Sequence, residues 1–214
     1  MAGNASVLRD GSRLSRIDQA LEAIEIRLAL VSGLAVFGLM LLAVVSVTGR
    51  NLLNFPVPGY VDWIEITMPL IAFMGISYTQ RNGGHIRMDI LIGKLKGRAM
   101  WAVELFSVLV MLVLVLFLIW GSWAHFDRSF DFAAPLWSRD STIDIRLPVW
   151  PAKLLVPFAF SILALRLALQ IWAYGRAFVT GAQNPIAVPL PLTAAEQAAE
   201  EASHVSALDN GGTA

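Results

Sequence analysis

Long apolar runs divide the chain into four candidate membrane-spanning helices. Residues 28–48 hold 21 consecutive uncharged residues, and residues 102–124 hold a run in which Glu104 carries the only charge. A helix needs about 20 such residues to cross a bilayer. Two further runs, about 60–80 and 151–174, are less apolar but long enough. The pattern predicts an all-α membrane protein whose transmembrane domain, residues 28–176, has four helices.

Composition agrees with this class and excludes others. Hydrophobic residues make up 57% of the chain and charged residues 15%, against roughly 45–50% and 25% in soluble domains. Lys plus Arg equals Asp plus Glu at 16 each, so no basic field indicates nucleic acid. The absence of cysteine excludes disulfides, thiolate catalysis and cysteine-ligated metals.

Histidine placement argues against an enzyme. A haem-carrying membrane anchor needs histidines at depth on facing helices, but His85 lies in a loop, His125 at the end of a span and His204 in the C-terminal tail. Because no histidine lies inside a predicted span, the serines there also lack a histidine base that could activate them as nucleophiles. We predict no catalytic site and no cofactor.

Basic residues near the spans predict the orientation, because the cytoplasmic side holds the excess of Lys and Arg. With four crossings, the N-terminal segment, the middle loop and the C-terminal tail share one side. Leaving out Arg166, the split is ten to five, with Arg50, Arg128, Arg139, Arg146 and Lys153 on the opposite side. Both termini and the middle loop are therefore expected in the cytoplasm.

The segments at the two ends are expected to differ. In residues 1–27, Ser15 and Asp18 resemble a capping box, and the positions that follow place apolar side chains on one helical face: Ile17, Leu21, Ile24 and Leu28. This predicts an amphipathic helix on the cytoplasmic surface before the first span. Residues 177–214 combine prolines with an acidic stretch, which predicts a disordered tail.

Three charged residues within the spans are candidate structural or assembly residues. Asp62 and Glu65 fall in the first turns of the 60–80 helix, where the helix dipole favours carboxylates. Arg166 lies about 21 Å from the outer end of its span, so it either snorkels to the interface or forms an ion pair within the protein or between subunits. No span is broken at its middle, so no transport route is expected through this chain.

The segment RNGGHIRMDIL, residues 81–91, interrupts the apolar pattern. Gly83 and Gly84 follow the second span, where a glycine at positive φ ends a helix without strain. The residues after them, including Arg87, predict a short basic interfacial helix against anionic lipid, although a solvated basic loop is the alternative. His85 and Asp89 are four residues apart, so on a helix they share a face and can hydrogen-bond as a structural lock.

The loop of residues 125–150 mixes charged and aromatic side chains. Aromatic residues at this level commonly form an interfacial belt. The alternative is that this surface docks an extracytoplasmic partner. Sequence alone leaves both interpretations open.

Two stretches of the chain resemble a known family. VTGRNLLNFPVPGYVDWIEITMPLIAFMGISYTQRNGGHIRMDILIGKL and STIDIRLPVWPAKLLVPFAFSILALRLALQ are similar to the small membrane subunit (DctQ-like) of tripartite ATP-independent periplasmic (TRAP) transporters. The resemblance covers about residues 27–177, and GGHIRMD with Glu65 upstream is its most specific element. The family often places a tryptophan and paired acids directly after a proline, whereas GYVDWIE follows Pro58 here. Either Asp62 or Glu65 therefore takes the usual acidic role.

The resemblance implies a secondary transport system of the bacterial inner membrane. A periplasmic binding protein captures an organic acid, and a large membrane subunit moves it by symport with sodium or protons. The small subunit is implied to be a non-catalytic scaffold that anchors the large subunit. The alternative from another class is a self-sufficient small channel or carrier that works as an oligomer.

Overall fold

The computed structural model describes residues 10, 12–55, 57–82 and 98–180. Its first element is α1 (Arg13–Leu52), a helix of 40 residues. Ser12 caps this helix, because its hydroxyl accepts a hydrogen bond from the backbone N–H of Ser15 at 3.3 Å. The predicted capping residues Ser15 and Asp18 therefore lie inside the helix, where both are buried.

The continuity of α1 corrects the prediction of a separate amphipathic helix. Residues 13–27 and the predicted first span form a single helix, which is itself a candidate membrane span. The expected apolar face is also wrong in part, since Ile17 and Ile24 are 48% and 46% exposed. The buried side of this part of α1 carries Asp18 and Glu25 beside Leu21. Carboxylates occupy this side because they have cationic partners on other helices, described below.

The second span consists of two helices, α2 (Tyr60–Phe73) and α3 (Ile76–Arg81). Sequence analysis predicts one continuous helix here, so the interruption at Met74 and Gly75 is a difference. Pro69 inside α2 removes one helical hydrogen bond, and glycine is a poor helix former. This span therefore contains two residues, Pro69 and Gly75, that each weaken a helix.

The remaining elements are α5 (Arg98–Ser129), the short 3-10 helix η1 (Pro135–Trp137) and α6 (Trp150–Thr180). No strand forms among the described residues, and only two isolated bridges occur in the connection between α5 and α6. Four helices are long and apolar enough to cross a membrane: α1, α2 with α3, α5 and α6. The predicted all-α class with four spans is confirmed.

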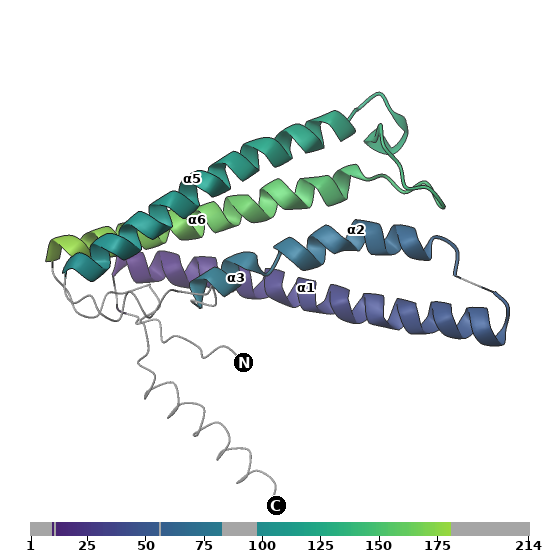
Figure 1. The fold of residues 1–214 in the computed structure, drawn as a ribbon, viewed down its shortest axis with the longest axis horizontal. Coiled ribbons are helices and arrows are strands. Elements are labelled where there is room, and N and C mark those ends of the chain that lie inside the picture. The colour runs from purple at the N-terminus through teal and green to yellow at the C-terminus, as the bar shows by residue number, and fades with distance from the viewer. Residues whose placement is uncertain (1–9, 11, 56, 83–97, 181–214) are drawn as a thin grey trace, which may run out of the picture.

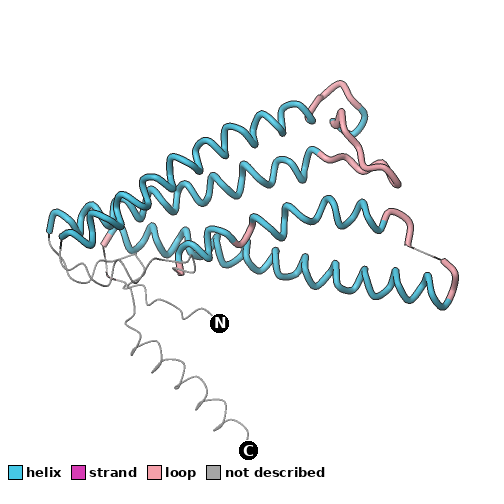
Figure 2. The backbone as a smooth tube through the Cα atoms, viewed as in Figure 1, coloured by secondary structure: helices cyan, strands magenta, loops and turns pink. Residues whose placement is uncertain are grey.

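The helices pack as two pairs, with α5 along α6 and α1 along α2 and α3 (Figure 1). The pairs converge at the end where α1 begins and α6 ends, which we call the terminal end. They spread apart toward the opposite end, which carries the connections after α1 and α5 and is called the loop end (Figure 2). Helix α2 contacts α6 of the other pair as well as α1 of its own, so it helps to join the two pairs.

The hydrophobic core lies mainly between α5 and α6. Trp101 of α5 packs on Tyr174 of α6 with ring centroids 6.0 Å apart, and small residues such as Ala173 and Ala177 let the helices approach. Most other large apolar side chains on α1 and α5 are exposed. Such faces are those that a bilayer covers.

Candidate functional site

Arg166 of α6 lies at the centre of a buried group of charges at the terminal end. Its side chain is fully buried. The guanidinium Nε and one terminal nitrogen donate to the two oxygens of Glu25 at 2.8 and 2.6 Å, and the other terminal nitrogen donates to Asp18. Both carboxylates come from α1. Of the two roles predicted for Arg166, the structure has the ion pair and not snorkelling.

Arg81, the last residue of α3, provides a second buried guanidinium. It donates to the other Asp18 oxygen at 2.9 Å and lies 3.0 Å from a carboxylate oxygen of Glu22. Asp18 therefore bridges the two arginines. The Ser77 hydroxyl of α3 donates to Glu25 at 2.5 Å. We call Asp18, Glu22, Glu25, Ser77, Arg81 and Arg166 the ionic cluster.

A neutral hydrogen bond extends the ionic cluster along α3 and α6. The amide nitrogen of Gln80 donates to the amide oxygen of Gln170 at 3.0 Å, and both side chains are buried. Two buried atoms nearby, Nε of Arg81 and Oε1 of Gln80, have no hydrogen-bond partner among the described residues. The polar layer thus joins three helices but is not completely satisfied within this part of the chain.

The ionic cluster suits a permanent junction better than a moving charge. An arginine side chain stays protonated in proteins, and its planar fork binds a carboxylate through two parallel bonds. Breaking such a buried pair by removing one partner costs roughly 3–5 kcal/mol, because it leaves an uncompensated charge. The cluster therefore fixes α1, α3 and α6 to one another.

Sequence analysis places Arg166 inside the last predicted span but does not identify the partners that the structure gives it. The available signal was the spacing of Asp18, Glu22 and Glu25 at positions i, i+4 and i+7, which puts three carboxylates on one face of a helix. Leu21 belongs to both this acidic face and the predicted apolar face. The prediction rests on the apolar side chains of this helix, whereas the structure buries the carboxylates.

Asp62 lies at the loop end of the bundle, opposite the ionic cluster. Its carboxylate accepts hydrogen bonds from the backbone N–H groups of Asp144 and Ile145, at 3.1 and 2.8 Å. The first turn of α2 thereby holds the connection between α5 and α6. Gly59, just before α2, has φ of +70°, and a Cβ added there would lie 2.5 Å from Cδ1 of Ile145. Glycine is required for both reasons.

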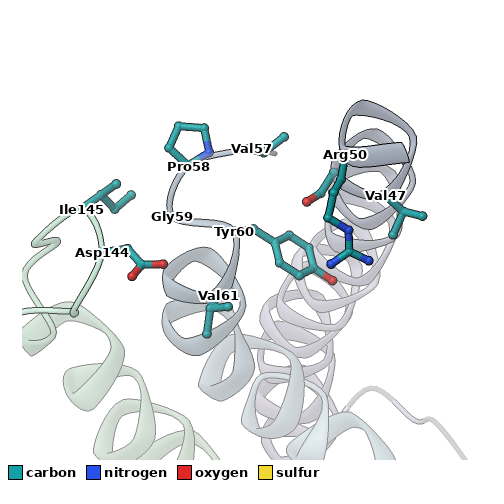
Figure 3. A pocket seen from close by; sticks show the side chains of 10 residues that line it. Val47, Arg50, Val57, Pro58, Gly59, Tyr60, Val61, Asp144 and Ile145 are labelled. Atoms are coloured by element: carbon teal, nitrogen blue, oxygen red, sulfur yellow. The ribbon is translucent and has the colours of Figure 1, made fainter. Parts of the chain in front are cut away.

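A pocket of about 550 Å³ lies at the loop end, between the end of α1, the start of α2 and the 144–145 backbone (Figure 3). Arg50 and Tyr60 line one part of it, and Asp144 lines another. Arg50 is exposed and forms no ion pair with another described residue. Figure 3 shows the start of α2 between the Arg50 and Asp144 side chains, and all residues that line the pocket belong to the loop end of α1, the start of α2 with the residues before it, and the 144–145 backbone.

The connection of residues 130–149 has a small aromatic core of its own. Phe130 packs on Phe126, Phe132 and Trp150, with ring centroids 5.2, 4.7 and 5.3 Å apart. Trp150 also donates its indole N–H to the Leu136 carbonyl at 3.0 Å. These contacts pack the connection against the ends of α5 and α6.

Polar contacts tie the same connection to α5 and α6. Lys153 donates to Asp140 at 2.6 Å, and the Ser129 hydroxyl donates to the same oxygen at 2.8 Å. These two hydrogen bonds hold the pKa of Asp140 below its ordinary value. The backbone N–H of Ala133 and the Arg139 guanidinium lower the pKa of Asp131 in the same way.

Of the other predicted site residues, the structure describes only Glu65, and it does not join these groups. Glu65 is exposed on α2, apart from the contacts that Asp62 makes. Gly83, Gly84, His85, Arg87 and Asp89 lie outside the described residues, as does the 181–214 part of the C-terminal tail. Among the described residues, no group of three or more acidic or histidine side chains is arranged to hold a metal ion.

Comparison with known families identifies a match. The family model described as "Tripartite ATP-independent periplasmic transporters, DctQ component" matches residues 39–175, which is more than half of the chain. A comparison with curated proteins gives no match. The matched segment includes Arg81 and Arg166, whereas Asp18 and Glu25 precede it. With four helices able to span a membrane and this match, the chain is a multi-pass membrane protein that belongs to the DctQ family, the small component of TRAP transporters.

Proposed function

We propose that this chain is a non-catalytic scaffold subunit of a TRAP transporter, which holds the large membrane subunit in the bilayer while that subunit moves the substrate. The system imports an organic acid by symport across the bacterial inner membrane, with a periplasmic binding protein as third component. Both termini of the chain are cytoplasmic.

The observation that carries this proposal is the state of Arg166. A transport route needs a charge or polar group that a substrate or ion can reach, and Arg166 is fully buried between two carboxylates. Because a guanidinium does not release its proton, the ionic cluster also makes a poor proton relay. These charges support a rigid junction.

Reconstitution into liposomes tests the proposal directly. The chain alone is expected to give background uptake of organic acids, and uptake should appear only when the large subunit and the loaded binding protein are added. Ion-driven accumulation by the chain alone would favour a self-sufficient oligomeric channel or carrier instead.

Cysteine labelling tests the orientation. The chain has no native cysteine, so a single cysteine at Asn82, at the terminal end, can be labelled selectively. An impermeant reagent should label it in inverted membrane vesicles and leave it unlabelled in intact spheroplasts. A cysteine at Ser141, in the loop-end connection, is the matched control with the opposite pattern. Labelling of Asn82→Cys in spheroplasts would contradict cytoplasmic termini.

A further inference from the structure

The span formed by α2 and α3 is the least apolar of the four. Over an 18-residue window, buried residues included, its mean hydropathy is 1.2, against 2.7, 3.0 and 2.0 for the other three. Helices α1 and α6 cover its other sides. The exposed positions are Val61, Glu65, Met68, Ala72 and Thr79, with Trp63 beside them. We call Val61, Glu65, Met68, Ala72 and Thr79 the α2 stripe.

The spacing of the α2 stripe is that of a helix-packing seam. Successive members are four, three, four and seven residues apart, which is the heptad spacing by which one helix packs along another. Gly75 falls in the gap of seven, and a Cβ added there would meet nothing within 4 Å. Small residues at such positions let a second helix approach closely within a membrane.

Glu65 shows that lipid alone is an unfavourable neighbour for this stripe. It lies five residues after Tyr60, about 7.5 Å along the helix axis, and makes no hydrogen bond or ion pair with another described residue. A charged side chain inside the membrane is costly and is normally paired. The acids of the ionic cluster follow that rule with Arg81 and Arg166. Among the described residues Glu65 has no such partner, so a donor from a neighbouring molecule would complete its pairing.

The negative charge of Glu65 distinguishes among the molecules that could pack against the α2 stripe. A second copy packed symmetrically through the α2 stripe would place Glu65 near another Glu65, because an isologous interface pairs a surface with itself, and the stripe contains no Lys or Arg. Anionic lipid headgroups repel a carboxylate as well. A different protein helix that carries a basic or hydrogen-bond-donating side chain matches the stripe.

We infer that the α2 stripe is the surface on which the large membrane subunit docks, with a transmembrane helix of that subunit presenting a cation or hydrogen-bond donor to Glu65. This inference rests on the proposed function. It assigns the docking to one face of one helix and to one carboxylate.

Photo-crosslinking in membranes that contain both subunits locates the docking face. A photoreactive amino acid replaces Met68 in one variant and Leu114, on the exposed face of α5, in the matched control. A product with the combined mass of the two subunits is expected from position 68 and not from 114. The same product from 114 only would overturn the inference while leaving the proposed function standing. A product of twice this chain's mass from 68 would also overturn the inference.

Glu65→Gln tests the carboxylate, with Thr67→Val as control because the Thr67 hydroxyl bonds only to the Trp63 carbonyl of its own helix. Glu65→Gln should weaken co-purification of the large subunit roughly 3- to 15-fold, with the unfolding temperature of this chain unchanged. Thr67→Val should change neither. Undiminished co-purification of Glu65→Gln would overturn the assignment. If the wild-type chain fails to co-purify with the large subunit at all, the proposed function fails with it.

Discussion

The two ends of the bundle are held by different kinds of interaction. At the terminal end, α1, α3 and α6 meet through side chains whose charges are buried: Asp18 and Glu25 surround Arg166, and all three are at most 1% exposed. At the loop end, Asp62 receives backbone N–H groups of a connection whose side chains are mostly exposed. Figure 1 shows the helices converging at the first end and spreading at the second.

The difference indicates where the bundle is rigid and where it can adapt. Removing one partner of a buried ion pair costs roughly 3–5 kcal/mol, because an uncompensated charge stays buried. Losing the carboxylate that accepts from two part-buried backbone N–H groups costs less, about 1–3 kcal/mol. The terminal end therefore serves as the fixed point of the scaffold, and the loop end can adjust locally. The predictions below test this contrast.

The largest effect is expected for Arg166→Leu. It leaves Glu25 without its guanidinium partner, so the free energy of unfolding should fall by roughly 3–5 kcal/mol. Chemical unfolding of the detergent-purified protein measures it. Arg166→Lys should rescue little, since an ammonium cannot bind two carboxylates in a fork. The double variant Arg166→Leu, Glu25→Leu should recover part of the loss, and a loss below about 1 kcal/mol for the single variant would contradict a rigid terminal end.

A smaller loss is expected for Arg81→Leu. Asp18 keeps its bond to Arg166 in this variant, and the Glu22 side chain, 15% exposed, can reach water. The free energy of unfolding should fall by about 2–3 kcal/mol, less than for Arg166→Leu. The same unfolding experiment ranks the two arginines. A loss equal to or larger than that of Arg166→Leu would make Arg81 the centre of the cluster.

Asp62→Ala should act at the loop end only. Two backbone N–H groups lose their carboxylate, which should cost about 1–3 kcal/mol locally. Hydrogen exchange at Asp144 and Ile145 should accelerate, while exchange in α3 stays unchanged. Asp62→Asn is the matched control, because its amide oxygen can still accept. Faster exchange throughout the bundle would show that the two ends are not independent.

Gly59→Ala should destabilise the same connection slightly less. A Cβ at φ of +70° is strained and meets the Ile145 side chain, so a local loss of about 1–2 kcal/mol is expected. Limited proteolysis between residues 140 and 148 measures the opening. The added variant Ile145→Ala should relieve the contact but not the backbone strain. Full recovery in that double variant would mean that the contact alone makes glycine necessary.

Acid should produce the smallest effect, also at the loop end. The pKa of Asp140 is lowered in the folded protein by Lys153 and Ser129, so its contribution to stability is complete above the ordinary pKa of about 3.9. That contribution is lost as the pH falls through the lowered pKa. The opening equilibrium that hydrogen exchange reports near residue 140, after correction for the intrinsic pH dependence of exchange, should therefore be unchanged between pH 7 and 5 and rise below about pH 4. Asp140→Asn should remove this dependence, and a rise that persists in this variant would assign it to another carboxylate.

Sequence patterns were sufficient to predict features that depend on the average apolar character of long segments. Apolar runs of about 20 residues fix four spans because an unpaired backbone cannot remain in hydrocarbon. The two stretches that contain GGHIRMD and the last span likewise led to the family that the comparison identifies. Asp62 is among the candidates from the sequence, but its role as an acceptor for the distant 144–145 backbone was not predictable from local pattern.

By itself, the sequence determined the class, the number of spans and the presence of a charge inside the last one. Only the tertiary structure decided which side of α1 faces inward, because Ile17 and Asp18 are neighbours on the chain and either face could be buried in an isolated helix. The choice depends on Arg81 and Arg166, which are 63 and 148 residues away from Asp18. Leaving a buried guanidinium without a carboxylate costs more free energy than exposing an isoleucine to lipid. The terminal end therefore buries Asp18 and leaves Ile17 exposed.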